Sequence, residues 1–234
     1  MLLRVADLFV EVPSNGGMSP RCRDYLSKEN VSADITICAD DYKPERWRDA
    51  SPEMVAYLDS GFFFYRDLLK FGGMMLHASA VELDGKAYLF SGPCGMGKST
   101  HTRLWQEVFG ERARVFNDDK PALRRIDGVW YAYGTPWCGK DGININMKAP
   151  IAGICFLKRG NENVIRRIGG IDAASAIISQ TMRKFKDPKN TDLMLSHVDT
   201  LINEIPIYEL HSRPEPEAAL LSYKTMSRCE EVNL

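Results

Sequence analysis

The stretch Gly92-Pro93-Cys94-Gly95-Met96-Gly97-Lys98-Ser99 matches the phosphate-binding loop pattern G-x-x-x-x-G-K-[ST]. Glycine at Gly92 and Gly97 permits backbone angles that turn successive N–H groups toward an anion. Lys98 supplies a positive charge for the β- and γ-phosphates, and the hydroxyl of Ser99 is suited to ligate Mg²⁺. The pattern predicts a nucleotide-phosphate site that runs from Gly92 to Thr100.

The residues around this loop have the order of elements that such a site needs. Residues 87–91 form a short apolar run of strand type, and residues 99–109 have the apolar spacing of a helix that ends at Gly110. A helix that begins at the loop adds the positive end of its dipole to the anion site. This order disfavours the alternative of a glycine-rich turn that contains Lys-Ser by chance.

The composition is that of a globular protein with a substantial core and no global charge. The chain has 234 residues, of which 44% are hydrophobic and 26% are charged, and its net charge is −1. A near-neutral chain gives no electrostatic reason to bind nucleic acid or an anionic membrane, so we expect neither partner. No apolar run approaches the ~18 residues that would span a bilayer. Residues 1–7 are cut by charge and do not predict a secretory signal.

The cysteines favour a reducing compartment. They lie far apart and include no C-x-x-C pair, which excludes the usual zinc spacings. Dispersed thiols suit a cytoplasmic protein, which is our expectation. The six positions are Cys22, Cys38, Cys94, Cys138, Cys155 and Cys229.

Residues 1–71 form a first, small region in which no catalytic pattern is visible. Ser51 followed by a proline marks a helix start, and apolar residues then recur near helical spacing as far as Gly72. Gly61 weakens the case for one unbroken helix. The aromatic cluster at residues 62–65 favours core packing over a partner surface. Two stretches alternate between apolar and polar side chains and predict half-buried strands: residues 8–12 and 33–38.

Residues 72–234 are predicted to form the catalytic domain, with an α/β fold. Hairpin turns are expected at Asp84-Gly85 and Asp127-Gly128. Many strands in hairpins, with the helices gathered late, indicate a mixed sheet flanked by helices. We expect helices at residues 99–109, 171–184, 192–204 and 214–226. We expect strands at residues 74–81, 87–91, 112–116, 123–126, 129–133, 143–147, 151–157, 164–168 and 207–210.

Two adjacent acids, Asp118 and Asp119, follow a predicted strand about twenty residues after Lys98. Ligands of nucleotide-binding α/β proteins lie at the carboxyl ends of strands, so these carboxylates should face the phosphates. Phosphoryl transfer needs one carboxylate for Mg²⁺ and another to orient or deprotonate the attacking hydroxyl. Neighbours on a regular strand point to opposite faces, so both reach the site only if the strand end bends. The alternative is an ordinary turn of Asn-Asp-Asp before a proline.

Other candidate residues are less specific. His77 lies on the predicted strand that pairs with the one before the loop, yet a lone histidine in an apolar strand is more often a core residue. His101 is expected to be exposed or near the phosphates. Residues 134–140 form a turn that either closes an aromatic and a cation over substrate or is an ordinary β-turn. Five cations could neutralise transition-state charge, although each alone fits a solvated surface: Arg159, Arg166, Arg167, Arg183 and Lys184.

The strand histidine, the loop and the paired aspartates together resemble a known family. Residues 76–100, L-H-A-S-A-V-E-L-D-G-K-A-Y-L-F-S-G-P-C-G-M-G-K-S-T, followed by V-F-N-D-D at residues 115–119, look like the catalytic domain of HPr serine kinase/phosphorylase and its smaller relatives. That family shares a P-loop nucleotide fold with ATP-using phosphoenolpyruvate carboxykinases. The resemblance covers His77 to about Thr135 well and extends loosely to Met226.

This resemblance implies roles for the residues that carry it. His77 becomes an active-site residue, Lys98 a phosphate ligand and Ser99 a metal ligand. Asp118 and Asp119 become the base and metal-site pair, with Asp119 counted beside Ser99 at the metal. Which of the two is the base stays open.

The chain also departs from the family. Bifunctional members carry a glutamate-arginine-glycine signature after the paired aspartates, and the corresponding residues 142–146, G-I-N-I-N, lack that glutamate. Residues 1–71 are shorter than the family's N-terminal domain. Phosphorylase activity, HPr as the substrate and the family's hexamer are therefore not predicted. The abbreviated relatives resemble kinases encoded beside peptide-modification genes, which implies a precursor peptide as the acceptor.

From the sequence we expect an ATP- and Mg²⁺-dependent kinase that transfers the γ-phosphoryl group to a hydroxyl, in particular a serine of a protein or peptide. A homo-oligomer is compatible with the sequence, which does not specify the oligomeric state. Two alternatives stay open: a small-molecule kinase that uses the same site, and a nucleotide-binding switch or pseudokinase that acts through a partner.

Overall fold

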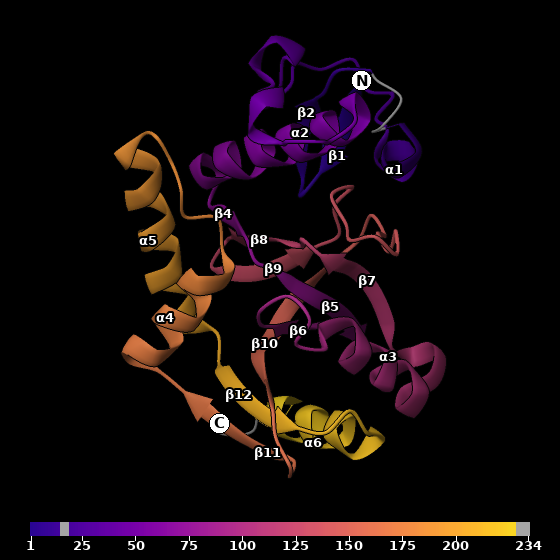
Figure 1. Cartoon of the computed structure of the whole chain (residues 1–234), viewed down its shortest axis with the longest axis vertical. Coiled ribbons are helices and arrows are strands. Elements are labelled where there is room, and N and C mark those ends of the chain that lie inside the picture. Colours follow the sequence, from indigo (N-terminus) through magenta and orange to yellow (C-terminus); the bar gives the residue numbers. More distant parts are fainter. Residues whose placement is uncertain (15–18, 228–234) are drawn as a thin grey trace.

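The computed structural model describes residues 1–14 and 19–227. It is a mixed α/β fold in which one large curled sheet lies between two groups of helices, with a smaller sheet beside it (Figure 1). This architecture confirms the predicted fold class, including the small N-terminal β-rich region.

The small sheet belongs to the N-terminal region and has the order β1-β2-β3. Strand β1 (Leu2–Val5) was not predicted, whereas β2 (Leu8–Glu11) and β3 (Ile35–Thr36) fall inside predicted strands. The short helix α1 (Ser19–Cys22) follows β2, and the long helix α2 (Pro52–Leu68) ends the region. Ser51 caps α2 by accepting a hydrogen bond from the backbone N–H of Met54, as its sequence predicted.

The large sheet has the strand order β4-β8-β9-β10-β6-β5-β7, and β12 pairs with both β10 and β11. Strand β10 begins beside β9 and continues between β6 and β12, so that it joins the two parts of the sheet. The strands are β4 (Gly73–Met75), β5 (Ala78–Leu83), β6 (Lys86–Ser91), β7 (Arg114–Asp119), β8 (Ala122–Ile126), β9 (Val129–Tyr133), β10 (Lys148–Arg159), β11 (Val164–Ile168) and β12 (Ile207–Ser212).

Strand directions bring several strand ends to one edge of this sheet. Strands β6, β10 and β12 are parallel neighbours. Strand β5 is antiparallel to both β6 and β7, so β7 runs in the same direction as β6. The carboxyl ends of β6, β7, β10 and β12 therefore share an edge with the beginning of β5, which is the edge where an α/β sheet holds its ligands.

Helices cover both faces of the sheet, as alternation along β6 shows. Leu89 packs into a core with α4 (Gly170–Gln180) and α5 (Pro188–Glu204). Tyr88 and Phe90 point the other way and pack with Trp105 of α3 (Lys98–Phe109) and with α6 (Pro216–Met226). A strand with apolar residues on both faces is what a central, fully covered strand requires.

Several sequence-based assignments were wrong in their extent; for example, helix α5 begins at Pro188 rather than at residue 192, and β7 runs to Asp119 rather than to residue 116. The predicted strand 74–81 is two strands, because β4 pairs with β8 whereas β5 pairs with β6 and β7. Residues 143–147 form no strand apart from a single bridge at Asn144, whose side-chain amide donates instead to the carbonyl of Arg21. Helix α4 ends at Gln180 rather than at residue 184.

The N-terminal region packs on the large sheet through aromatic side chains. Phe64 of α2 stacks on Trp137 with ring centroids 4.5 Å apart, and Tyr65 lies edge-on to the same indole at 5.7 Å. Phe63, Phe64 and Tyr65 are buried, so the expectation of core packing was correct for most of this cluster. Helix α2 continues through Gly61 without a break. Glycine suits this position because the absence of a Cβ lets the Trp137 indole approach the helix backbone.

The described residues also bear on the membrane and cysteine expectations. Within residues 1–14 and 19–227, no helix combines the length and the apolar character needed to cross a membrane. Free thiols are present at Cys22, Cys38, Cys94, Cys138 and Cys155. Cys229 lies outside the described residues.

Gly61→Ala should destabilise the protein although alanine favours helices. The added Cβ would lie 2.8 Å from Cδ1 of Trp137, and overpacking of this kind outweighs the helix-propensity gain of about 1 kcal/mol. We expect a net loss of about 1–2 kcal/mol in urea unfolding. The control is Met54→Ala on the exposed start of the same helix, expected within about 0.5 kcal/mol of wild type. A Gly61→Ala variant as stable as wild type would contradict the packing described.

Candidate functional site

One residue, Ala78, fixes the relative positions of the predicted site residues. It is paired with Ser91 at the end of β6 on one side and with Asp119 at the end of β7 on the other. His77 immediately precedes it, and the phosphate-loop pattern begins immediately after Ser91. The side-chain hydroxyl of Ser91 donates to the carbonyl of His77 at 2.8 Å, which links the two strand ends further. The histidine, the loop and the aspartates therefore meet in one row.

The phosphate-loop pattern adopts a compact turn around the Lys98 ammonium. Gly92, Gly95 and Gly97 have φ values of +145°, +76° and +99°, in the region that side chains with a Cβ rarely adopt. Nζ of Lys98 donates to the carbonyls of Gly92 at 3.0 Å and Pro93 at 3.3 Å. Helix α3 begins at Lys98, so its N-terminus faces the loop.

Burial governs the electrostatics of this lysine. Lys98 is 8% exposed, and desolvation lowers its pKa below the ordinary value against the opposing charges of Asp119, Cys94 and Asp118. The surrounding loop is open to solvent, because Pro93, Cys94, Gly95 and Thr100 are exposed while Met96, Gly97 and Ser99 are half-buried. A partly desolvated cation at the base of an exposed loop is an arrangement suited to an anionic ligand.

Asp118 belongs to the loop side of the site. It is 7% exposed, and the hydroxyl of Ser99 donates to its carboxylate, with oxygen–oxygen distances of 3.1 Å to Oδ1 and 2.8 Å to Oδ2. The sequence-based hypothesis made Asp119 a metal ligand together with Ser99, whereas the side chain in contact with Ser99 is that of Asp118. The two aspartates are thus in different surroundings.

Asp119 lies instead between two cationic or protonatable side chains. Its Oδ1 is 3.0 Å from Nε2 of His77, and its Oδ2 accepts from Nζ of Lys120 at 2.7 Å. Burial alone would raise the pKa of Asp119, but the hydrogen bond from His77 and the charge of Lys120 outweigh it, so the pKa is held well below its usual range. The carboxylate is therefore ionised at neutral pH.

A backbone turn at the end of β7 separates the two carboxylates. Asp119 has a φ of +98°, which supplies the bend that two adjacent aspartates need to reach one site. A hydrogen bond stabilises this turn, because the backbone N–H of Gly139 donates to the carbonyl of Asp118 at 2.6 Å. The side chain of Asn117 also anchors it by donating to the carbonyl of Thr135 at 3.0 Å.

Three side chains beside Asp119 were missed by sequence reasoning. Lys120 directly follows the aspartates, and its pKa is raised because the nearby Tyr57 and Asp119 outweigh burial. The hydroxyl oxygen of Tyr57, on α2, accepts a hydrogen bond from Nζ of Lys120 at 3.4 Å. Gln180, at the end of α4, has its Oε1 3.2 Å from Nδ1 of His77. Only Lys120 had a signal in the sequence, its place next to two acids, while the other two come from distant helices.

The structure corrects some of the weaker expectations. His101 is 4% exposed with its Nε2 3.1 Å from Oγ of Ser222, and burial lowers its pKa to about 4. It is therefore not an exposed residue but a neutral one of the α3–α6 interface, where it also borders the cavity beside the phosphate loop. Trp137 is fully buried against α2, so it is a packed wall of a small apolar pocket rather than a cover that moves over a substrate. Among the candidate cations, Arg159 contacts the loop by donating to the carbonyl of Gly95 at 3.4 Å, whereas Arg166 forms an exposed ion pair with Glu209.

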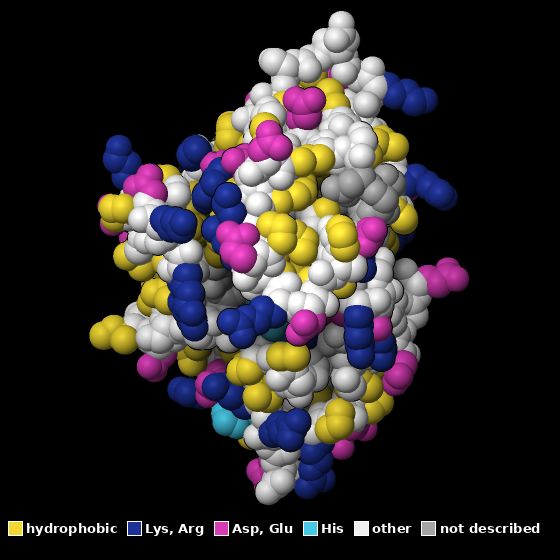
Figure 2. Space-filling model, turned by 45° about the horizontal axis from the view of Figure 1, so that its top comes forward, with side chains coloured by type: hydrophobic (Ala, Val, Ile, Leu, Met, Phe, Trp, Pro, Cys, Tyr) yellow, Lys and Arg dark blue, Asp and Glu magenta, His cyan; other side chains and the backbone are white. Residues whose placement is uncertain are grey.

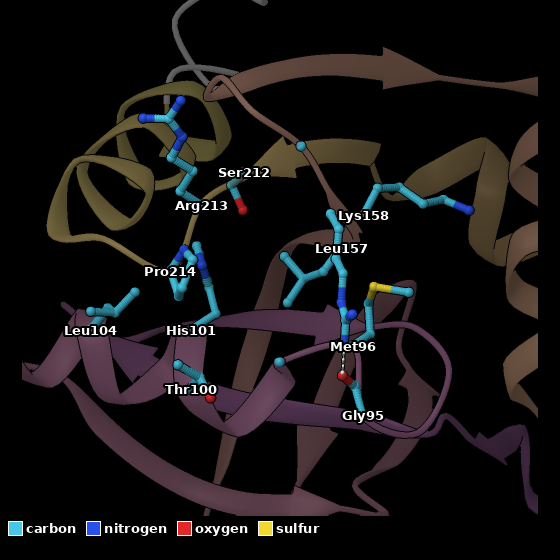
Figure 3. A pocket seen from close by; sticks show the side chains of 13 residues that line it. Gly95, Met96, Thr100, His101, Leu104, Leu157, Lys158, Ser212, Arg213 and Pro214 are labelled. Atoms are coloured by element: carbon cyan, nitrogen blue, oxygen red, sulfur yellow. Dashed lines mark hydrogen bonds between the residues drawn. The ribbon is translucent and has the colours of Figure 1, made fainter.

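Two cavities border different parts of this row of residues. One, of about 440 Å³, is bounded by the phosphate loop, α3, the end of β10 and the segment that follows β12. Figure 3 shows Leu157 and Pro214 on the border of this cavity above α3, whereas the side chain of Lys158 points away from it. The dashed line in the figure marks the hydrogen bond from Arg159 to the carbonyl of Gly95. The other, of about 340 Å³, is lined by His77, Asp119, Lys120 and residues 179–181. The phosphate loop therefore borders the larger cavity, and Asp119 borders the smaller one.

The donor atoms at the loop suit a magnesium ion shared with phosphates. No group of three or more His, Cys, Asp or Glu side chains with the arrangement of a metal site occurs in residues 1–14 and 19–227. Ser99 and Asp118 nevertheless present hard oxygen donors side by side. Mg²⁺ is usually held by one or two such protein ligands together with substrate phosphates and water. The residues present therefore fit this ion.

Comparisons with known proteins give a similarity at the level of structure. No protein-family model matches the chain, and no curated protein matches its sequence. Among solved structures, the chain is similar to the Hpr(Ser) kinase/phosphatase from Coxiella burnetii, with 12% identity and a TM-score of 0.38. The similarity covers 68% of this chain and 90% of that chain. It concerns the fold alone, and the function is argued below from the residues themselves.

Asp119→Asn should remove stability that depends on pH. Because the pKa of Asp119 in the folded protein lies below the ordinary 3.8, its ionised form contributes stability fully above about pH 5 and loses it as the pH falls through 3.8 and below. Urea unfolding should show wild type about 1–3 kcal/mol more stable at pH 7, with the difference shrinking below about pH 5. Asp84→Asn, which loses only an exposed pair with Arg112, should show a smaller difference. A difference independent of pH would contradict this charge arrangement.

Proposed function

We propose that this protein is an ATP- and Mg²⁺-dependent kinase that transfers the γ-phosphoryl group to a serine hydroxyl of a protein or peptide. One observation carries the proposal. The pairing of Ala78 with both Ser91 and Asp119 puts the phosphate loop and an ionised carboxylate at one sheet edge, where the loop borders one cavity and Asp119 borders another. Phosphoryl transfer needs such an arrangement, with the donor on one side and the acceptor on the other.

ATP would bind on the loop side. The loop amides, the N-terminus of α3 and Lys98 would hold the phosphates. The cavity of about 440 Å³ continues from the loop between α3 and the ends of β10 and β12, and falls in the size range of small-ligand sites. The nucleoside would occupy this cavity, and Arg159 beside Gly95 would lie near its entrance.

Ser99 and Asp118 would hold Mg²⁺ together with the phosphates. The bound ion would supply neutralisation of charge on the phosphate oxygens during transfer. Asp118 is well placed for this role because it is nearly buried and already in contact with the Ser99 hydroxyl. This assignment gives the metal to Asp118 and leaves Asp119 for the acceptor.

Asp119 would act on the attacking hydroxyl. The serine oxygen would form a bond to the γ-phosphorus as the bond to the β,γ-bridging oxygen breaks, and the hydroxyl proton would pass to the Asp119 carboxylate. Its low pKa keeps this carboxylate ionised and able to orient the hydroxyl by accepting a hydrogen bond. His77 and Lys120 hold its two oxygens in place, while Lys98 would stabilise the charge on the transferring group.

A comparison of two single substitutions tests the division of roles. Asp119→Asn should lower transfer about 10²–10⁴-fold at saturating Mg²⁺ with ATP affinity retained, because it removes the acceptor carboxylate. Asp118→Asn should instead raise the Mg²⁺ concentration needed for half-maximal transfer and for tight ATP binding, since it removes a metal ligand. The measurements are transfer of labelled γ-phosphate to a serine peptide pool, and calorimetric ATP binding over a Mg²⁺ titration.

The control is Asp141→Asn, which affects an exposed pair with Arg103 and should match wild type. Equal behaviour of the Asp118 and Asp119 variants would overturn the division of roles. A parallel assay with small alcohols distinguishes a small-molecule kinase, which would label the alcohols and not the peptides. Tight ATP binding without transfer to any acceptor would overturn the kinase and favour a nucleotide-dependent switch.

A further inference from the structure

We propose that the acceptor is an acidic peptide segment that lies along a track of three adjoining cavities, which begins at Asp119 and ends at a cationic groove. This inference rests on the proposed function and specifies its substrate. The peptide would place its serine at Asp119, an aromatic or leucine-sized side chain in an apolar pocket, and an Asp or Glu in the groove beyond. The track lies between the N-terminal region and the segment that joins α4 to α5.

The three cavities are connected through shared lining residues. The cavity of about 340 Å³ at Asp119 shares Met75 and Lys120 with a pocket of about 140 Å³. That pocket shares Phe62 with a third cavity of about 290 Å³. The three cavities are therefore neighbours on the surface, and a peptide chain that extends from the reacting hydroxyl would reach each in turn.

The middle pocket suits a single apolar side chain. Its lining includes Trp47, Phe62, Tyr65 and Met182, and polar surface is nearly absent from it. Its size is close to the roughly 150 Å³ of an apolar cavity that accepts benzene. The wall formed by Trp47 is anchored, because its indole Nε1 donates to the fully buried Asp59 at 2.8 Å. A rigid apolar pocket next to the reaction centre is a means of selecting the residue near the serine.

The third cavity is cationic. Four of its lining side chains are positive and two are negative. Of the negative ones, Asp67 is already paired with Arg66 at 2.6 Å and Lys70 at 2.8 Å, and Asp187 accepts from the backbone N–H of Lys189 as a helix cap. The positive residues are Arg46, Arg66, Lys70 and Lys186. With two acids among the lining side chains, the groove carries a net charge of +2, and Arg46 and Lys186 are the two cations that do not pair with Asp67. On a chain whose net charge is −1, this local positive charge matches an acidic side chain.

Aromatic rings hold two of these cations in position. The guanidinium of Arg46 lies over the ring of Phe62 at 5.1 Å, and that of Arg66 lies over Phe63 at 4.8 Å. Arginine presents a planar fork that pairs with carboxylates in two hydrogen bonds, and stacking reduces the freedom it loses on binding. The fork of Arg66 already pairs in this way with Asp67, so Arg46 is the arginine that would meet an acidic side chain of the peptide. Lys and Arg side chains gather along one side of the face in Figure 2, next to exposed hydrophobic ones.

The elements on either side of the track explain what the N-terminal region contributes. Helix α2 supplies Phe62 and Arg66 on one side, and the α4–α5 segment supplies Met182 and Lys186 on the other. Figure 1 shows the start of α5 beside α2, far along the sequence from it. Tyr57, also on α2, contacts Lys120, so the same helix borders both the reaction centre and the peptide track.

Charge reversal with substrate rescue tests the groove. Transfer of labelled γ-phosphate is measured on a library of capped peptides that carry one serine and vary at the five positions on each side. Wild type should prefer an aromatic residue or leucine near the serine and an Asp or Glu farther on the same side. The double variant Arg46→Glu with Lys186→Glu should lose about tenfold or more in kcat/KM for the acidic peptide, which corresponds to about 1.4 kcal/mol. Replacing the acid of the peptide by lysine should restore the rate.

Matched controls separate the groove from general charge. The double variant Arg48→Glu with Lys184→Glu changes two exposed cations that do not line the groove and that lie two residues from Arg46 and Lys186 in the sequence. This variant should keep the wild-type preference for an acidic peptide. Met182→Lys should remove the preference for an apolar residue, whereas Met182→Leu should keep it. Equal rates for acidic and neutral peptides in wild type, or no effect of the Arg46 and Lys186 reversal, would overturn the track while the kinase stands.

A binding measurement distinguishes failure of the kinase from failure of the track. Fluorescence anisotropy is measured with a labelled peptide that carries leucine near the central position and glutamate farther on the same side, with alanine in place of the serine, so that the measurement needs no phosphoryl transfer. Weaker binding to the Arg46→Glu, Lys186→Glu variant than to wild type supports the track even if no peptide is phosphorylated, in which case the proposed reaction is wrong. Absence of both binding and phosphorylation for every peptide overturns the track and the proposed acceptor together.

Discussion

The double pairing of Ala78 is the constraint on which the candidate site depends. Strand β5 is hydrogen-bonded on one side to the strand that leads into the phosphate loop and on the other to the strand that ends in the aspartates. A shift of one residue in either register would turn the neighbouring side chains to the opposite face of the sheet. Backbone pairing in a covered sheet therefore holds His77, the loop and Asp119 in one row with a rigidity that loops alone could not supply.

Within this row, a single left-handed residue gives two adjacent carboxylates different surroundings. Asp118 is nearly buried and contacts the hydroxyl of Ser99, whereas Asp119 turns away and meets His77 and Lys120. The positive φ of Asp119 has an energetic cost, and the hydrogen bond from Gly139 to the carbonyl of Asp118 helps to hold that conformation. Environment rather than residue type thus distinguishes a carboxylate suited to a metal from one suited to a hydroxyl.

The N-terminal region is joined to the sheet by a continuous aromatic core, with Trp137 between them. The indole stacks on Phe64 and approaches Gly61, and its Nε1 donates to the hydroxyl of Ser60 at 3.0 Å. Because Trp137 lies just before Gly139, this packing reaches the turn that holds Asp118. Helix α2 consequently stabilises the turn at the aspartates through Trp137 and Gly139, and it also forms one side of the proposed peptide track.

The sequence by itself predicted the strand and helix on either side of the loop pattern, and it pointed to the Asp118-Asp119 pair as candidate site residues, because these depend on residue type at short spacing. It also indicated the mixed sheet, since most strands carry their own apolar pattern and turn residues. Only the tertiary structure decided which aspartate meets Ser99, that Tyr57 and Gln180 lie beside the site, and that His101 and Trp137 are core residues. Those facts depend on registers and helix packing between residues far apart in the chain, and local sequence patterns do not encode them.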